Sequence, residues 1–351
     1  MWLIAIKSKP MKIVNFISGK DLGGPKQSFV LYSEALSKLD HEVHSVVRKG
    51  ATIKPLIEQL NLPLHEVSYS RITQLIAKKT ITKTLKEKFD IIQPDLIFCH
   101  KQSDLELVRN AVGNNITIIG VIHWFSNKHI KLADELIAVS EKVKKFLIDN
   151  DYEKPIHVIP NMVKITSETT YRDLPEVPLI GAMGLFRRKK GFHTLIEALA
   201  ILKQNGEPFK AIIAGKGQLK PYLHYLRWRF KLTNELTIRG WVSNAERDAF
   251  VDSIDIFVLP SRIETFGMVV IEAMARMKRV VATKCGGPEE ILNHGKTGYL
   301  VNKQNPDALA AQFKEIVANP KPSNIVALNA QIHTLAHYSI EAVTNKISKV
   351  L

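Results

Sequence analysis

Glu264 and Glu272 are the two residues whose type and spacing best suggest chemistry. A mostly apolar run at 254–259 ends at Pro260 and predicts a buried parallel strand, and the apolar residues after Gly267 predict a packed helix. Glu264 then lies in the loop at the carboxyl end of a strand, where open α/β sheets bind ligands, and Glu272 lies on the second helical turn. Carboxylates suit hydroxyl groups, and the amides at a helix N-terminus suit a phosphate. Four residues supply those amides: Phe266, Gly267, Met268 and Val269. The combination predicts a sugar-nucleotide site.

This segment resembles the retaining GT-B glycosyltransferases of family four. In that family a Glu-x7-Glu pair follows a Pro-Ser strand end, and a Gly-Gly-x-x-Glu loop comes later. Here the strand end is Pro260-Ser261 and the later loop is Gly286-Gly287-Pro288-Glu289-Glu290. The resemblance implies that Glu264 holds donor-sugar hydroxyls in catalysis and that Glu272 binds the ribose. It also implies a metal-independent reaction without a cofactor.

Three further segments match the family, with one departure. Lys190 occupies the position of the lysine that holds the donor pyrophosphate, and the resemblance gives it a part in catalysis. Leu185 stands where the family has an arginine, so we expect Arg187 or Arg188 to reach the diphosphate in its place. The glycine pair Gly23-Gly24, between the first strand and the first helix, matches a donor-contacting glycine loop. His123, at a strand end, matches a histidine near the donor sugar, and the resemblance gives it a part in catalysis; His100, at another strand end, is interpreted as structural.

The pattern of strands and helices predicts two doubly wound α/β domains. Strands are expected at 12–16, 42–47, 95–99, 117–122, 135–139 and 156–159, and after a polar linker at 179–183, 211–214, 236–239, 254–259 and 280–283. The expected division is an extension at 1–10, an acceptor-binding domain at 11–165, a nucleotide-sugar-binding domain at 166–335, and a helix at 336–351 that crosses back to the first domain. In fold class this is GT-B, two Rossmann-like domains facing across a cleft.

The composition limits what the chain can be. It has 351 residues and a formal net charge of +15, from 49 Lys and Arg against 34 Asp and Glu. No apolar run reaches the roughly 18 residues of a membrane span, and Cys99 and Cys285 are isolated, which predicts reduced thiols and a cytoplasmic enzyme. The positive charge suits nucleic acid, an anionic membrane or an anionic substrate. An aromatic content of 7% without a recognised module argues against nucleic acid.

The most basic stretch, 71–89, has apolar residues at helical spacing and predicts a basic amphipathic helix. Two interpretations remain open: a helix that lies on an anionic membrane, and a helix packed on the core with a solvated basic back. Metal sites are not expected, because Asp149-Asn150-Asp151 follows a helix in a turn-like sequence and His333 and His337 have no third ligand nearby.

The expected function is transfer of a hexosyl group from a UDP- or GDP-linked sugar to a glycan acceptor in envelope polysaccharide or lipopolysaccharide synthesis. We expect this acceptor to be lipid-linked. The enzyme would be cytoplasmic or peripheral on the cytoplasmic face of the inner membrane. Two alternatives keep the fold: a sugar-nucleotide epimerase, which would turn over the donor without an acceptor, and an inactive sugar-nucleotide-binding homologue, which Leu185 favours.

Overall fold

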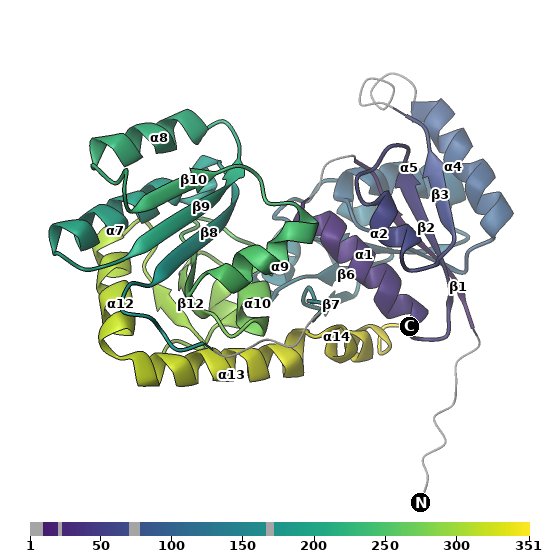
Figure 1. Cartoon of the computed structure of the whole chain (residues 1–351). Coiled ribbons are helices and arrows are strands. Elements are labelled where there is room, and N and C mark those ends of the chain that lie inside the picture. The colour runs from purple at the N-terminus through teal and green to yellow at the C-terminus, as the bar shows by residue number, and fades with distance from the viewer. Residues whose placement is uncertain (1–9, 20–22, 70–77, 166–171) are drawn as a thin grey trace, which may run out of the picture. The chain divides into compact units, whose positions relative to one another are not determined.

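The computed structural model describes residues 10–19, 23–69, 78–165 and 172–351. The chain divides into two compact units, Met1–Met162 with Ile340–Leu351, and Val163–Ser339. The divisions therefore fall at 162/163 and 339/340, where the sequence suggested 165/166 and 335/336. Each unit is a parallel sheet with helices packed on it (Figure 1).

The first unit contains a seven-stranded parallel sheet in the order β3-β2-β1-β4-β5-β6-β7. Its strands are β1 (Lys12–Ile17), β2 (Glu42–Arg48), β3 (Leu64–Val67), β4 (Leu96–Cys99), β5 (Thr117–Ile122), β6 (Glu135–Ala138) and β7 (Ile156–Val158). The helices are α1 (Gly24–Ser37), α2 (Lys54–Glu58), α4 (Lys78–Ile92), α5 (Leu105–Val112), α6 (Glu141–Ile148) and α14 (Ile340–Ile347). The order reverses direction at β1, and β1, β4 and β5 are neighbours, so the segments that follow them lie at one edge of the sheet.

The chain's last helix, α14, belongs to the first unit although it follows the second in sequence. It packs against α1, and Lys38 forms an ion pair with Glu341 at 3.0 Å. Both side chains of this pair are exposed, so the pair contributes little stability and the packing is the main attachment.

Helix α4 decides between the two interpretations of the basic stretch. The residues before Lys78 lie outside the described part of the chain. From Lys78 on, the apolar face is buried in the first unit through Ile81, Leu85, Phe89 and Ile92, and the lysines lie on the opposite face. This apolar face is therefore covered by protein, which supports the interpretation of a helix packed on the core with a solvated basic back for the described part.

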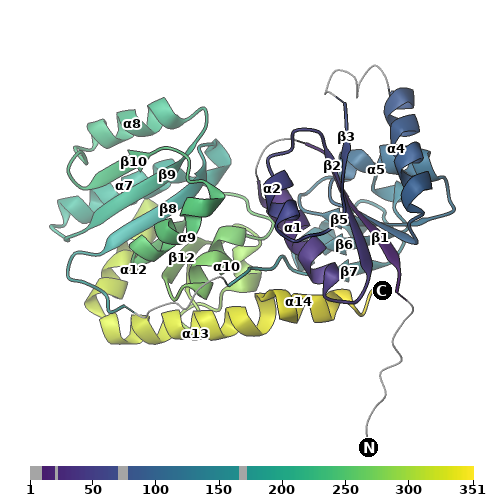
Figure 2. The same cartoon turned by 45° about the vertical axis from the view of Figure 1, so that its right-hand side comes forward.

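The second unit contains a six-stranded parallel sheet in the order β10-β9-β8-β11-β12-β13. Its strands are β8 (Leu179–Leu185), β9 (Lys210–Lys216), β10 (Leu236–Arg239), β11 (Ile256–Leu259), β12 (Arg279–Thr283) and β13 (Tyr299–Val301). The helices are α7 (Phe192–Gln204), α8 (Lys220–Arg229), α9 (Asn244–Ser253), α10 (Met268–Ala275), α11 (Pro288–Ile291), α12 (Pro306–Ala318) and α13 (Pro320–Tyr338). Side chains of α7, α8 and α12 share one core with the strands, and α10 packs against α13 (Figure 2).

Strands β11 and β12 are buried along their whole length, as expected for central parallel strands that read as continuous apolar runs. Among the described residues, no helix has the length and the apolar character needed to cross a lipid bilayer.

Candidate active site

Three loops of the second unit meet at the carboxyl ends of the neighbouring strands β8, β11 and β12. The loop after β8 contains a short 3-10 helix, Arg188–Lys190, and its Lys189 carbonyl accepts a hydrogen bond from the Arg262 amide at 2.8 Å. The loop after β11 is joined to the loop after β12 by a bridge between Glu264 and Gly286. Backbone groups therefore fix the three loops to one another, at the sheet edge where parallel α/β sheets bind ligands.

Lys190 and Glu264 form an ion pair across the first two of these loops. Their side chains are only 22% and 13% exposed. The two charges together are neutral, so each compensates the partial desolvation of the other. The structure thus brings together two of the three residues that were expected to act in catalysis, one from each loop, while the third, His123, belongs to the first unit.

The backbone of Glu264 is held from the side of β12. Its amide donates to the Cys285 carbonyl at 3.0 Å, and its carbonyl accepts from the Gly287 amide at 2.8 Å. A Cβ on Gly286 would lie 2.2 Å from the Glu264 carbonyl oxygen, and the φ of Gly286 is +129°. Only glycine allows this approach, which explains the glycine pair of the loop.

The N-terminus of α10 lies beside this arrangement. Gly267 begins it with a φ of 108°, and no side chain caps it. Phe266 is buried against the ring of Tyr338, while Met268 and Val269 are partly exposed at the first turn. The first amides of an α-helix have no partner within the helix, so this end can donate hydrogen bonds to an anion.

Glu272 lies on the second turn of α10 and is 6% exposed. It forms an ion pair with Arg247 of α9 at 2.8 Å. Neither α9 nor a role for Arg247 was predicted from the sequence. A signal was present, because Ser243 and Glu246 form a capping box that starts the helix carrying Arg247.

Leu185 is the last residue of β8 and is partly buried. Arg187 and Arg188 follow it, are exposed, and make no ion pair with a described residue. The pKa of Lys189 is lowered by burial and by the charge of neighbouring Lys190. The loop therefore concentrates positive charge around the Lys190–Glu264 pair.

The remaining expected site residues belong to the first unit. Gly23 is the N-cap of α1, Gly24 its first residue, and the space above the Gly23 Cα is open; residues 20–22 of this loop lie outside the described part. His123 follows β5, and its Nε2 is 3.3 Å from Nδ1 of His100, which follows the neighbouring β4.

Burial lowers the pKa of His123 to about 3 and holds the pKa of His100 well below its usual value. His100 is 1% exposed and meets the rings of Phe29 and Tyr32 of α1, as expected for a structural histidine. Both rings are therefore neutral at neutral pH, so His123 can offer a hydrogen bond but not a fixed positive charge.

The described residues contain no group of three or more His, Cys, Asp or Glu side chains placed to hold a metal ion. Asp151 has a φ of +58° in the turn after α6, in keeping with a turn instead of a ligand loop. Cys285 is a free thiol whose pKa burial raises to about 11, so it is a poor nucleophile.

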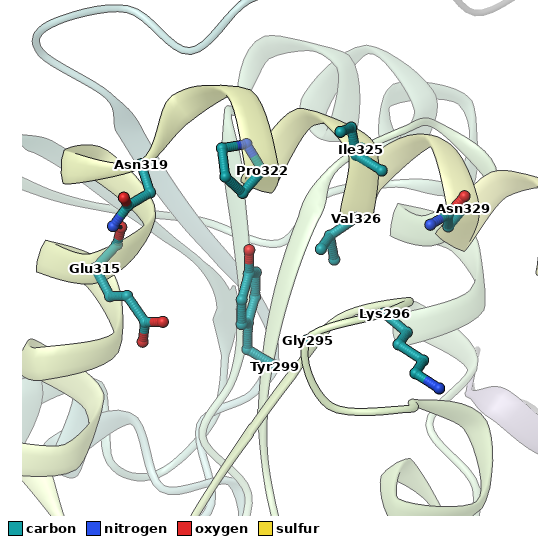
Figure 3. Close-up of a pocket in the computed structure, with 9 residues that line it drawn as sticks. All are labelled: Gly295, Lys296, Tyr299, Glu315, Asn319, Pro322, Ile325, Val326 and Asn329. Atoms are coloured by element: carbon teal, nitrogen blue, oxygen red, sulfur yellow. Dashed lines mark hydrogen bonds between the residues drawn. The ribbon is translucent and has the colours of Figure 1, made fainter.

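A cavity of about 500 Å3 lies elsewhere in the second unit, between α12, α13 and the turn before β13. Figure 3 shows the Tyr299 ring pointing toward Pro322, with Glu315 to one side and Lys296 to the other. None of the expected site residues lines it.

Comparison with known proteins identifies the family. The model of glycosyl transferases group 1 matches residues 172–333, and that of glycosyltransferase family 4 matches residues 22–167. The lipopolysaccharide core biosynthesis glycosyltransferase LpsE of Rhizobium meliloti is 26% identical over 97% of this chain and 99% of its own. The lipopolysaccharide core biosynthesis mannosyltransferase LpcC of Rhizobium leguminosarum is 25% identical over 63% of this chain and 65% of its own.

Solved structures agree on the fold. HepE of Anabaena, in complex with UDP and glucose, superimposes with a TM-score of 0.81 at 22% identity, over 97% of this chain and 99% of its own. The lipopolysaccharide outer core galactosyltransferase WaaB gives 0.75 at 17% identity, over 97% and 98% of the two chains. Together with the two parallel Rossmann-like sheets, these matches establish that the chain belongs to the group 1 glycosyltransferases of the GT-B fold.

Proposed function

We propose that this glycosyltransferase moves a hexosyl group from a UDP- or GDP-linked sugar to a lipid-linked glycan acceptor, with retention of configuration and without a metal ion. The acceptor class is supported by LpsE and LpcC, which are named for lipopolysaccharide core synthesis. A nucleotide-sugar donor is supported by the structural likeness to HepE, which was solved with UDP and glucose. A cytoplasmic enzyme at an anionic membrane surface fits such an acceptor.

The observation that carries the proposal is the Lys190–Glu264 pair beside the uncapped N-terminus of α10. In the proposed complex, Lys190 and the amides of Phe266 to Val269 stabilise the charge that develops on the leaving diphosphate. Glu264 accepts hydrogen bonds from hydroxyls of the donor sugar. Glu272, oriented by Arg247, accepts from the ribose hydroxyls.

The charge balance of the site favours a role for Arg187 and Arg188 in binding the donor diphosphate. Since Lys190 and Glu264 are already neutral together, the diphosphate would add about two negative charges to a site with no surplus cation from that pair. Arg187 and Arg188 are exposed and free of ion pairs with described residues, so either can turn toward the donor. This would offset the loss of the arginine that Leu185 replaces.

The reaction needs no nucleophile from the protein in this proposal. The bond from the anomeric carbon to the diphosphate oxygen breaks, and the acceptor hydroxyl bonds to the same face of that carbon. A donor phosphate oxygen takes the acceptor's proton, and the products are the glycosylated acceptor and the nucleoside diphosphate. His123 is neutral and contributes a hydrogen bond to the donor sugar.

A panel of UDP- and GDP-linked sugars, followed by thermal shift, tests the donor. A ligand present at 100 times its Kd stabilises the folded state by about 2.7 kcal/mol, so the correct donor gives a clear rise in Tm. Transfer to a lipid-linked acceptor extract is then measured with that donor. Glu264→Ala is expected to abolish transfer and to leave nucleoside diphosphate binding intact; full activity in this variant contradicts the site.

Leu185 favours a second candidate function, that of an inactive sugar-nucleotide-binding homologue. The same assays separate the two: donor binding without transfer to any acceptor, and without release of nucleoside diphosphate, favours the homologue. Donor conversion in the absence of acceptor favours the epimerase.

A further inference from the structure

Helix α8 presents a row of aromatic side chains to solvent. Tyr222, Tyr225 and Trp228 are 44%, 52% and 68% exposed, and consecutive rings lie 6.4 and 6.2 Å apart. The opposite face of the helix is anchored by Leu223 and Leu226, which are buried in the core of the second unit. The aromatic row is therefore not needed to hold the helix in place, and such large exposed apolar groups call for a partner.

The exposure of these rings is unusual within the molecule. Among the described residues, the large aromatic side chains that are exposed are Trp124 and these three, so α8 carries three of the four. In Figures 1 and 2, α8 lies beside β10 on the outside of its unit, and it packs against α7 and β10.

Positive charge surrounds the row. The chain has no acidic residue between Glu207 and Glu235, and this interval contains six cations: Lys210, Lys216, Lys220, Arg227, Arg229 and Lys231. Lys220, Arg229 and Lys231 are exposed. At about 100° per residue, Arg229 falls between Tyr222 and Tyr225 around the helix, and Lys220 falls about 80° beyond Trp228.

We propose that this face of α8, the aromatic row with Lys220, Arg229 and Lys231, docks on an anionic membrane surface. Tyr and Trp favour the membrane–water interface, because their rings are apolar at one end and polar at the other. Lys and Arg beside them are attracted to anionic lipid headgroups. Apolar rings flanked by cations form the pattern of a helix that lies in the plane of the interface.

Two other helices of the molecule have either exposed apolar side chains or basic side chains, but not both on one face. Helix α4 is basic, but its apolar face is buried, so it offers charge without apolar contact. Helix α13 exposes Ile325, Leu328, Ile332 and Leu335, but no Asp, Glu, Lys or Arg lies between Pro322 and Tyr338. It offers apolar contact without charge. On α8 both occur on one face.

This docking surface would keep the enzyme near lipid-linked acceptors, and in that role it rests on the proposed function. The two remain separately testable, because vesicle binding does not depend on donor binding. A docking surface on the unit that carries Lys190 and Glu264 also differs from the basic helix that the sequence suggested.

The test is co-sedimentation of the full-length protein with vesicles of phosphatidylcholine alone and with phosphatidylglycerol added. Wild-type protein is expected to bind only the anionic vesicles, and less as salt is raised. The triple variant Lys220→Gln, Arg229→Gln, Lys231→Gln is expected to bind about 100-fold more weakly, since each cation at an anionic surface strengthens binding about fivefold. The triple variant Tyr222→Ser, Tyr225→Ser, Trp228→Ser is expected to lose about tenfold or more.

The matched control is Lys79→Gln, Lys83→Gln, Lys86→Gln on α4, which removes the same charge from an exposed face of the other unit. It is expected to weaken binding less than about threefold, because α4 is not part of the proposed docking face and salt screens charges that do not contact the lipid. An equal loss in both charge variants would mean that net charge alone drives binding and would overturn the proposal. Every variant is compared with wild type in its Tm, so that a folding defect is recognised.

Two further outcomes overturn the inference. One is the absence of binding to anionic vesicles. The other is binding of a free anionic polysaccharide that depends on Tyr222, Tyr225 and Trp228 while vesicle binding does not, which would make the row a glycan platform. Normal vesicle binding by a protein that binds no nucleotide sugar would refute the proposed function and leave this docking surface standing. Quenching of Trp228 fluorescence by brominated lipid, absent in Trp228→Phe, locates the contact.

Discussion

Gly191 connects the loop of Lys190 to the end of β11, and its replacement by alanine tests the architecture of the site. Its φ is +67°, and an added Cβ would lie 1.8 Å from the carbonyl oxygen of Pro260. That neighbour is backbone, so it cannot rotate away as a flexible side chain would. Gly206, just after the other end of α7, provides the matched control, because its φ is +73° and an added Cβ meets nothing within 4 Å.

The two substitutions share one cost and differ in another. Alanine at a left-handed position costs about 1–2 kcal/mol in either place. At Gly191 the backbone must also move by about 1.5 Å to restore ordinary contact with Pro260, and such overpacking typically costs about 1–3 kcal/mol more. We therefore expect Gly206→Ala to lower the free energy of unfolding by about 1–2 kcal/mol and Gly191→Ala by about 2–5 kcal/mol.

Gly191→Ala is expected to reduce the transfer rate more than its loss of folding stability alone would suggest. Movement at Gly191 changes the position of neighbouring Lys190 relative to Glu264, and a misplacement of about 1 Å in a catalytic constellation can reduce the rate about 100-fold. Urea unfolding measures stability, and donor affinity with transfer rate measures function at a temperature where both variants are folded. Equal stability and equal transfer rates in the two variants would refute the idea that this glycine contact positions Lys190.

Three further predictions address individual side chains. We expect the donor Kd to rise severalfold in Lys190→Ala and in at least one of Arg187→Ala and Arg188→Ala, and Leu185→Arg to tighten donor binding. Normal donor Kd values in all of the alanine variants would show that this loop is not the phosphate site. Glu272→Gln is expected to raise the donor KM through a lost charge-assisted bond of about 1.5–3 kcal/mol, with a non-additive effect when combined with Arg247→Ala because the two are paired; a change confined to the acceptor KM would contradict the ribose role. Burial lowers the pKa of His100 in the folded state, so the unfolded state takes up a proton first as the pH falls. The contribution of His100 to stability is therefore complete above about pH 6.5 and decreases below that pH by up to about 1.4 kcal/mol per pH unit. The urea midpoints at pH 7.5 and pH 5.5 should differ less for His100→Gln than for wild type.

The strands that build the site were predictable from the sequence, because central parallel strands leave uninterrupted apolar runs. The expected strands at 179–183, 254–259 and 280–283 match β8, β11 and β12, each bound to within two residues. The short edge strands β3 and β13 were missed. Each has only three or four residues and partly buried positions, so neither gives a strong pattern.

The positions of Glu264, Glu272 and Lys190 were predicted from motif and resemblance, and their roles stay predictions. Their pairing was not predicted, since Lys190 and Glu264 are 74 residues apart and Arg247 and Glu272 are 25 apart. Long-range pairs depend on the order of strands in the sheet, which a single sequence does not state. For the helix of the basic stretch, charge and periodicity define an apolar face and a basic face but do not say whether the apolar face meets the protein core or a membrane. The burial of Leu85 and Phe89 shows that the apolar face meets the core.

The backbone contacts among the three strand-end loops have a consequence for engineering donor choice. The Lys189 carbonyl, the Gly191 approach to Pro260 and the bridge from Glu264 to Gly286 fix loop shapes against one another without using the side chains that face the donor. A loop transplanted alone from a relative would meet foreign neighbours at these contacts. The three loops should therefore be exchanged between relatives as one cassette, while single side chains such as Leu185 can be changed one at a time.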